Sequence, residues 1–327
     1  MRIGMVGTNF ISDMFMKAAA PISGIQVSAV TSGHRENAEK FAQRYGIPVV
    51  SDSLADLIAS GICDMVYLAV PNSLHAEMAE QCIAAGMPVF IEKPIATNAA
   101  QAERVFRLAE QRQVYVHDGI VPLYTENFRI LKESLGRIGR IRRAVFAFGK
   151  RSSRYDAYLA GQNPTTFRRE LSNGSLMDLG IYCLADAVAL FGKPDQVMAH
   201  AVKLDTGVDG AAEAVLCYPG FDAVIMTSKI SDTLTATEIE GEDGNLVIEA
   251  PSLISKVWLT ERGSTERKLI SRDTENAFGF QLQDILTDLA EGKRESSLVP
   301  HGLSMDIMSV LDAVRAGCGI VYPQDER

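Results

Sequence analysis

Apolar residues recur along the first third of the chain in short runs, and the segments between the runs place apolar residues at helical spacing. The runs lie at residues 2–6, 25–30, 64–70, 89–91 and 114–116. Short apolar runs bounded by glycine or proline are typical of buried parallel strands, and the longer segments between them predict helices. The alternation predicts an α/β fold: a doubly wound parallel sheet of the Rossmann type over residues 1–120.

The pattern changes after residue 120. Strand-like runs separated by polar or glycine turns now dominate, and they predict a large, mostly antiparallel open sheet in an α+β domain over residues 121–327. An apolar helix interrupts the runs at about residues 175–190, and two helices of structural character are predicted at 280–291 and 302–316. The predicted strands are 141–148, 196–204, 212–218, 221–230, 235–240, 246–249 and 256–260.

Composition excludes several classes of protein. The 327 residues, 47% of them apolar and 22% charged, suit a globular protein of two domains. No segment approaches the roughly 18 uninterrupted apolar residues of a membrane span, and the N-terminus lacks a signal-peptide pattern, so we expect a cytoplasmic protein with no membrane partner. A net charge of −9 argues against a nucleic-acid partner. The five cysteines and five histidines are dispersed, so neither disulfides nor a metal site is expected.

The first strand leads into Gly-Thr-Asn-Phe-Ile-Ser at residues 7–12, where a dinucleotide-binding turn is expected. In the G-x-G-x-x-G pattern Asn9 and Ser12 replace the second and third glycines. Asparagine tolerates positive φ and serine is small, so both replacements are compatible with such a turn. We expect cofactor phosphates to bind at the turn and the helix N-terminus that follows. The residues concerned are Gly7, Thr8, Asn9, Phe10 and Ile11.

The choice between NAD and NADP is expected to depend on the end of the second strand. An acidic residue about 20 residues after the turn would hold the ribose 2′-hydroxyl of NAD, but none is present. The chain instead has Ser32, His34 and Arg35, a small hydroxyl followed by potential cations, which suit a 2′-phosphate. In the alternative interpretation Arg35 is an exposed residue that opens the next helix. The sequence favours NADP over NAD.

Chemistry is expected where the fifth predicted strand ends. Glu92, Lys93 and Pro94 directly follow the apolar run 89–91. Because ligands of open α/β sheets bind at the carboxyl ends of the strands, this lysine is placed for chemistry. The alternative is a solvated Glu-Lys pair in a loop.

Polar residues also follow the fourth predicted strand. Val70, Pro71 and Asn72 break this strand at its carboxyl end. His75 comes three residues later, where it either contacts the cofactor or caps its own helix.

The apolar helix at 175–190 carries a second set of polar residues. Asp178, Tyr182 and Asp186 recur at every fourth position and are expected to share one face. A solvent-facing stripe is the alternative to a site.

With Glu92-Lys93-Pro94 and Asp178-Leu179-Gly180-Ile181-Tyr182 in place, the chain resembles the glucose–fructose oxidoreductase / inositol dehydrogenase / MocA (GFO/IDH/MocA) family. Residues 3–8, residues 70–75 and the closing Tyr322-Pro323 extend the resemblance over almost the whole length. It implies that a Rossmann domain binds NAD(P) and that substrate binds against the open sheet of the C-terminal domain, whose other face forms the interface of a homodimer or homotetramer. It also implies oxidation or reduction of hydroxyl and carbonyl groups of sugars, polyols and related diols.

The resemblance also assigns roles. It implies that Lys93 is the catalytic lysine, that Glu92 is its cofactor-side neighbour and that the Lys93–Pro94 bond is cis. Tyrosine at position 182, where inositol dehydrogenases carry histidine, resembles the dihydrodiol and xylose dehydrogenase branch, which argues against an inositol substrate without excluding it. Three further candidates for the substrate pocket, for which ordinary packing is the alternative, are Tyr124, Phe167 and Arg168.

The chemistry itself needs two groups. Oxidation of an alcohol by hydride transfer releases a proton and develops charge on the oxygen. Our hypothesis is that Lys93 stabilises this charge and Tyr182 exchanges the proton, while Asp178 orients substrate hydroxyls or the lysine. Two alternatives use the same fold, namely a non-catalytic NADP-sensing regulator and an NAD-dependent glycosidase.

Overall fold

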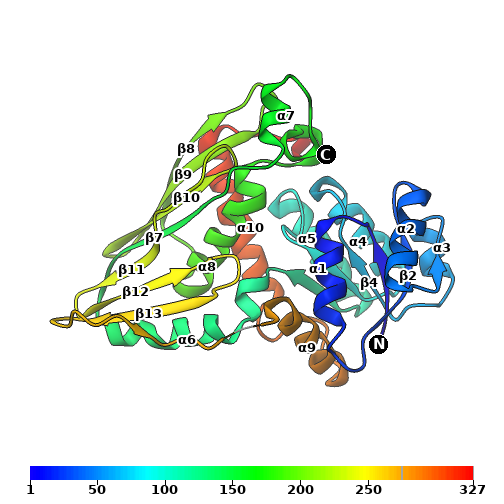
Figure 1. The fold of residues 1–327 in the computed structure, drawn as a ribbon, viewed down its shortest axis with the longest axis horizontal. Coiled ribbons are helices and arrows are strands. Elements are labelled where there is room, and N and C mark those ends of the chain that lie inside the picture. Colours follow the sequence, from blue (N-terminus) through cyan, green and yellow to red (C-terminus); the bar gives the residue numbers. More distant parts are fainter. Residues whose placement is uncertain (274, 327) are drawn as a thin grey trace. The chain divides into compact units, whose positions relative to one another are not determined.

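The structure is a computed structural model, and it describes residues 1–273 and 275–326. The chain divides into two compact units (Figure 1). Unit 1 consists of Met1–Gly119 and Asn276–Ser304, and unit 2 of Ile120–Glu275 and Met305–Arg327. The sequence pattern placed all of residues 121–327 in the second domain, whereas residues 276–304 pack in unit 1.

Unit 1 is built on a six-stranded parallel sheet. Its strand order is β3-β2-β1-β4-β5-β6, which is the order of a doubly wound sheet. The long apolar runs form its centre, where Met5, Val66 and Phe90 are completely buried. The strands are β1 Arg2–Val6, β2 Gln26–Thr31, β3 Val49–Val50, β4 Met65–Leu68, β5 Val89–Glu92 and β6 Val116–Gly119. The Rossmann prediction is confirmed.

Helices connect these strands, and local sequence explains where three of them begin. The side chains of Asn9, Ser53 and Asn98 each accept a hydrogen bond from a backbone N–H of the first turn, which is the ordinary N-cap interaction. The helices are α1 Phe10–Ala19, α2 Arg35–Tyr45, α3 Leu54–Ala59, the 3₁₀ turn η1 Asn72–Leu74, α4 His75–Ala84 and α5 Ala99–Arg112.

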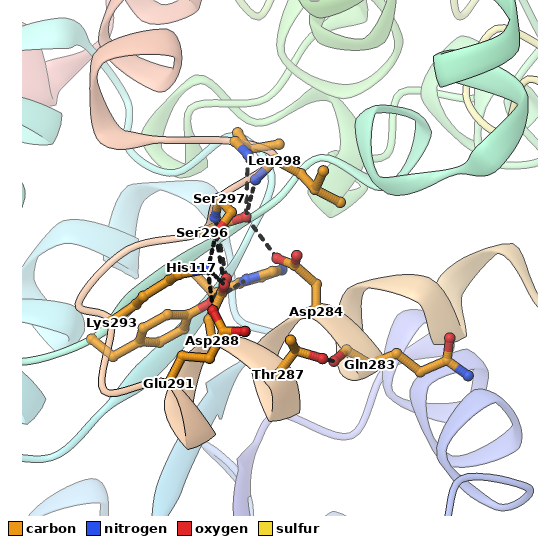
Figure 2. A network of polar contacts seen from close by, with 12 residues as sticks. His117, Gln283, Asp284, Thr287, Asp288, Glu291, Lys293, Ser296, Ser297 and Leu298 are labelled. Carbon is orange, nitrogen blue, oxygen red and sulfur yellow. Dashed lines mark hydrogen bonds and ion pairs between the residues drawn. The ribbon is translucent and has the colours of Figure 1, made fainter.

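A distant segment completes unit 1 along the edge strand β6. Helix α9 (Ala277–Ala290) is followed by residues that pair with this strand, since the Val116 N–H donates to the Arg294 carbonyl at 3.2 Å. A polar network around the buried Asp288 anchors the segment (Figure 2). In it the Asp288 carboxylate accepts hydrogen bonds from the Ser297 hydroxyl at 2.8 Å, from Lys293 at 3.1 Å and from the Tyr115 hydroxyl at 3.4 Å. The segment therefore covers an edge that would otherwise present unpaired backbone groups.

Unit 2 is built on an eight-stranded sheet of order β14-β13-β12-β11-β7-β10-β9-β8. All pairs are antiparallel except β7 with β10, so the prediction of a mostly antiparallel sheet is confirmed. The sequence pattern missed only the short β14. The strands are β7 Ile141–Gly149, β8 Gln196–Lys203, β9 Asp209–Tyr218, β10 Phe221–Ser228, β11 Thr237–Gly241, β12 Gly244–Glu249, β13 Lys256–Glu261 and β14 Lys268–Leu269.

One face of this sheet is covered by helices. Alternate residues such as Ile225, Ile239 and Leu246 are completely buried, while their strand neighbours are partly exposed. Helix α8 packs against β7 and β10, and α6 packs against β13. The helical segments are η2 Val121–Tyr124, α6 Glu126–Ser134, η3 Leu135–Ile138, α7 Tyr155–Leu159, η4 Thr165–Phe167, η5 Arg169–Leu171, the π-helical η6 Leu176–Gly180, α8 Ile181–Phe191, α10 His301–Cys318 and η7 Pro323–Glu326.

The helix expected at residues 175–190 therefore begins differently from the prediction, because its first turn, η6, is π-helical. The stretch Arg169–Phe191 is long and apolar enough to cross a membrane by length and composition alone, but 72% of its most apolar window is buried inside the protein. Such burial is typical of a core helix.

Candidate active site

The turn after β1 depends on Gly7. Its φ is +106°, and a Cβ at this position would lie 2.1 Å from the Ala69 carbonyl oxygen, so only glycine fits. The Ser12 side chain is completely buried, and its hydroxyl donates to the Gly7 carbonyl at 3.0 Å. Serine thus fills the place of the third glycine and also ties the helix back to the turn.

Asn9 does not take a glycine-like conformation. Its φ of −90° is ordinary extended backbone, so the expectation based on positive φ was wrong. Its Oδ1 accepts from the N–H groups of Ile11 at 3.0 Å and Ser12 at 3.3 Å, and its Nδ2 donates to the Ala69 carbonyl at 2.9 Å. An N-cap needs an extended backbone and an acceptor side chain, and Asn9 supplies both. Phe10, the first residue of α1, is 76% exposed.

The residues expected to select the cofactor lie at the end of β2. The Thr8 hydroxyl contacts that of Ser32 at 3.4 Å, so the phosphate turn and this strand end are adjacent. Arg35, the first residue of α2, is exposed and pairs with Glu39 at 2.8 Å and with Asp52. His34 precedes α2 and makes no capping hydrogen bond to the described helix.

His75 is a buried link between two strand ends. Its Nε2 lies 2.9 Å from the Val70 carbonyl oxygen after β4, and its Nδ1 lies 2.7 Å from the Pro94 carbonyl oxygen after β5. Burial lowers the pKa of its imidazole, and the charge of Lys93 acts in the same direction. The helix-capping alternative is not seen, because Leu74 is the N-cap residue of α4.

Glu92 and Lys93 lie at the carboxyl end of β5, where the sequence predicted them. Glu92 is buried, and its carboxylate accepts from the Tyr67 hydroxyl at 2.7 Å and from the Lys93 N–H at 3.3 Å. Burial raises the pKa of Glu92 to about 7, although Tyr67 and Lys93 oppose this shift. Lys93 itself is half-buried, and the Lys93–Pro94 bond is cis.

A second buried carboxyl lies on the neighbouring strand. Asp118 of β6 pairs in register with Ile91 of β5, one residue before Glu92. Burial, together with the charge of Glu92, raises the pKa of Asp118 to about 7, although the hydrogen bond from Ser304 opposes this shift. Sequence reasoning overlooked Tyr67 because it lies within an apolar strand. It overlooked Asp118 because no recognisable motif surrounds it, although it stands just after the apolar run 114–116.

The polar residues of the apolar helix in unit 2 do not share one environment. Asp178 on η6 and Tyr182 on α8 are partly exposed, whereas Asp186 is completely buried. Each four-residue step on an α-helix advances about 40° beyond a full turn, so the three residues drift around the helix, and the π-helical turn shifts them further. The Tyr182 ring lies 6.2 Å from that of Phe148. The interpretation as one solvent-facing stripe is therefore wrong for Asp186.

Asp178 forms an ion pair with Lys229, which follows β10. The Lys229 side chain is 10% exposed and that of Asp178 is 39% exposed. Sequence reasoning missed Lys229, which stands at the end of an apolar strand without any motif.

The loop before Asp178 is fixed by buried contacts. Gly174 has a φ of +143°, and a Cβ there would lie 2.1 Å from Asp209 Oδ1, so the position requires glycine. Asp209 Oδ2 accepts from the Leu176 N–H at 2.6 Å, and burial raises the pKa of Asp209 to about 7. The Tyr322 hydroxyl, near the C-terminus, donates to the Asn173 carbonyl at 2.8 Å. These contacts hold the first turn of the helix that carries Asp178.

The three weaker candidates are placed as follows. Tyr124 is 3% exposed, and Phe167 is completely buried beside the rings of Tyr155 at 5.9 Å and Tyr158 at 5.5 Å. Arg168 is exposed and donates to the Asn163 carbonyl at 2.8 Å. For Phe167 this placement favours ordinary packing.

Among the described residues no three His, Cys, Asp or Glu side chains are grouped as a metal site requires.

Comparison with known proteins agrees with this architecture. Residues 1–120 match the model of the oxidoreductase family with an NAD-binding Rossmann fold, and residues 132–247 match that of the GFO/IDH/MocA C-terminal domain. The chain is 37% identical over 325 residues to the scyllo-inositol 2-dehydrogenase (NADP(+)) IolU of Bacillus subtilis (strain 168), with 99% of each chain covered. It is 28% identical over 345 residues to trans-1,2-dihydrobenzene-1,2-diol dehydrogenase of Mus musculus, with 100% of this chain and 99% of the relative covered.

A solved structure has the same fold. The 3-ketoreductase KijD10 from Actinomadura kijaniata, in complex with NADP and TDP-benzene, superposes with a TM-score of 0.86 at 23% identity, covering 97% of this chain and 98% of that one. Both family models, together with a relative at 37% identity over the full length, confirm the resemblance that the motifs indicated. The chain belongs to the GFO/IDH/MocA family of NAD(P)-dependent oxidoreductases.

Proposed function

We propose that this protein is an NADP-dependent dehydrogenase that oxidises a secondary hydroxyl of a neutral polyol, such as an inositol or a related cyclic diol, or reduces the corresponding ketone. The observation that carries the proposal is Lys93, half-buried at the carboxyl end of β5 in a nicotinamide-binding Rossmann unit. The relatives named as an inositol dehydrogenase and as dihydrodiol dehydrogenases support the substrate class.

The cofactor would be held by unit 1. The segment from Gly7 to Ile11 would bind the phosphates through backbone N–H groups. The Gly7 N–H donates to the Thr31 carbonyl, and Asn9 accepts from the Ile11 N–H, so the phosphates depend mainly on the N–H groups between these two residues. Residues expected to line the nicotinamide end of the site are Val70, Pro71, Asn72, Glu92 and Lys93.

The preference for NADP rests on the end of β2. Ser32, His34 and Arg35 offer a hydroxyl and potential cations, and no carboxylate occupies the strand end where NAD enzymes place one. Arg35 is exposed, so its surface ion pairs are weak enough to be exchanged for a phosphate. IolU is named as NADP-dependent, and KijD10 was solved with NADP, in agreement with this preference.

The reaction requires little more from the protein than charge and a proton path. Nicotinamide, when bound, supplies the hydride acceptor or donor. In the proposed mechanism Lys93 places a positive charge beside the reacting oxygen, Tyr182 takes the hydroxyl proton during oxidation and returns it during reduction, and Asp178 accepts a hydrogen bond from another substrate hydroxyl.

Cofactor reduction, followed by absorbance, tests this function. NADP and NAD are compared in parallel across inositols, trans-diols, aldoses and acyclic polyols. We expect turnover with NADP and with at least one cyclic polyol. If no substrate reduces either cofactor although NADP binds tightly, the dehydrogenase proposal is contradicted. That result would support the sensor or the glycosidase alternative. Retention of NAD through purification without its net reduction would distinguish the glycosidase from the sensor.

We further propose that the open face of the unit 2 sheet forms a homo-oligomer interface. A row of partly exposed side chains crosses seven strands in register. The row consists of Met198, Val215, Val224, Val145, Glu238, Val247 and Trp258. Contiguous apolar surface of this kind on a sheet is typical of an interface.

Sedimentation velocity tests the oligomer. We expect a dimer or tetramer for the wild type, and a shift toward monomer for Val224→Glu, because a carboxylate would be buried at the centre of the row. Thr260→Glu, on the same face but toward its rim, is the matched control. A monomeric wild type at micromolar concentration would contradict the proposal.

A further inference from the structure

Lys229 is an unusual lysine in this fold because it is buried. Only 10% of its side chain is exposed, and lysines are almost never buried without a partner. Its main chain is fixed on both sides, since its N–H donates to the Gly210 carbonyl at 2.8 Å and its carbonyl accepts from the Ser152 N–H at 2.8 Å. The charge is therefore carried on a rigid part of unit 2.

The partner of this charge is Asp178, which the proposed function places at the substrate. The two residues form an ion pair, and the Asp178 side chain is 39% exposed whereas the Lys229 side chain is almost covered. Lys229 therefore reaches Asp178 from the protein side. It is not positioned to meet a substrate directly.

The two elements that carry the pair are locked together. The hydroxyls of Ser175, before η6, and Thr227, on β10, lie 2.8 Å apart. A Cβ at Gly180 would lie 3.3 Å from Thr227 Cγ2, so helix and strand are in close contact. Because this contact sets the spacing between Lys229 and Asp178, the ion pair fixes the orientation of the carboxylate and not the packing of the helix.

We propose that Lys229 is a positioning residue that acts through Asp178 and selects polyols carrying a second hydroxyl near the reacting carbon. This inference rests on the proposed function. A carboxylate ion is purely a hydrogen-bond acceptor, and held in one orientation by Lys229 it receives a hydroxyl from a fixed direction. Without the lysine the carboxylate loses the charge that orients it, so that the substrate must order it on binding, which weakens binding more than turnover.

The test compares Lys229→Met, Asp178→Asn and the double variant with the wild type on the best polyol of the substrate panel. We expect Lys229→Met to raise KM by about 10- to 100-fold and to lower kcat by less than about tenfold, because the loss concerns ground-state binding. We expect the double variant to lie within about twofold of Asp178→Asn, since a residue that acts only through Asp178 adds nothing once that carboxylate is gone.

Two further variants separate positioning from a general structural role. Lys229→Arg keeps the charge and is expected to recover most of the wild-type KM. Lys256→Met is the matched control, because it removes a lysine that pairs with Glu249 at 3.2 Å on the exposed part of the same sheet, and it is expected to leave KM unchanged. Thermal unfolding verifies that each variant is folded.

The outcomes are distinguishable. An active wild type with an unchanged KM in Lys229→Met, or with additive effects in the double variant, overturns the role of Lys229 and leaves the proposed function intact. Should Lys229→Met fail to fold, the KM of Asp178→Asn tests the proposal instead, because an unchanged KM in that variant overturns it. Calorimetric titration of the polyol into the NADPH complex gives the same comparison without turnover, because the reduced cofactor cannot oxidise a polyol. A wild type that neither binds nor oxidises any polyol overturns the proposed function, and this inference with it.

Discussion

Replacing Lys93 by methionine is expected to abolish most turnover, lowering kcat by about a thousandfold, because it removes the charge that stabilises the developing alkoxide. Methionine retains much of the length and the apolar stem of lysine. NADP affinity is expected to stay within about threefold of the wild type, since one cofactor contact contributes little beside the phosphate turn. Steady-state kinetics and a fluorescence titration of NADPH measure the two quantities separately.

Lys40→Met is the matched control for this experiment. Lys40 lies on α2 in the same unit, is exposed and pairs with Glu36 at 2.6 Å, so its loss should change neither kcat nor cofactor affinity. Equal turnover in Lys93→Met and the wild type would remove Lys93 from the mechanism. A large loss of NADPH binding would instead make Lys93 a cofactor ligand.

Tyr182→Phe is expected to lower kcat by roughly 100- to 10,000-fold, the range over which a positioned general acid or base contributes. The hydroxyl is removed and the ring remains, so its contact with Phe148 at 6.2 Å is kept and the helix should not be disturbed. Profiles of kcat against pH for both proteins are the measurement. We expect the wild-type rate of oxidation to rise with pH as the proton acceptor becomes available, and the residual rate of Tyr182→Phe to lose that dependence.

Tyr158→Phe serves as the control for loss of a phenol in unit 2. The Tyr158 hydroxyl accepts from the Asp205 N–H at 3.1 Å on a surface segment, so kcat and its pH profile should be those of the wild type. Full activity of Tyr182→Phe at every pH would transfer the proton role to another group, and the buried carboxyl of Glu92, whose pKa burial raises to about 7, would be examined next.

Much of the fold could be predicted because the residues within each helix and strand indicate that element by themselves. The runs around Val66 and Phe90 are apolar without interruption, as strands covered on both faces must be, and Asn98 marks the start of α5 by capping it. The motif Glu92-Lys93 was found because a charged pair directly after a buried run is conspicuous. In each case neighbouring residues carry all of the information.

What escaped prediction depends on contacts between distant residues. Nothing near Lys229 in the sequence indicates that it meets Asp178, since the pair forms only when β10 packs against η6. The raised pKa of Asp118 and the hydrogen bond from Tyr67 to Glu92 both depend on burial, which a strand pattern does not reveal. Asn9 was misinterpreted because the glycine pattern suggested a conformation, whereas the residue supplies a cap.

The comparisons also change how strongly the residue at position 182 bears on the substrate. A tyrosine there argued against an inositol substrate, yet the full-length relative at 37% identity is named as an inositol dehydrogenase. Likeness over 325 residues carries more information than one residue, and for this reason inositols stand beside diols in the proposed panel.

The return of residues 276–304 to the edge of the first sheet has a consequence for biosynthesis. When Gly119 leaves the ribosome, β6 still lacks the segment that pairs with it, so the nascent chain carries an open strand edge. At roughly 5–20 residues per second, the intervening chain takes on the order of ten seconds or more to appear. During this interval the edge of β6 is open to pairing with other chains.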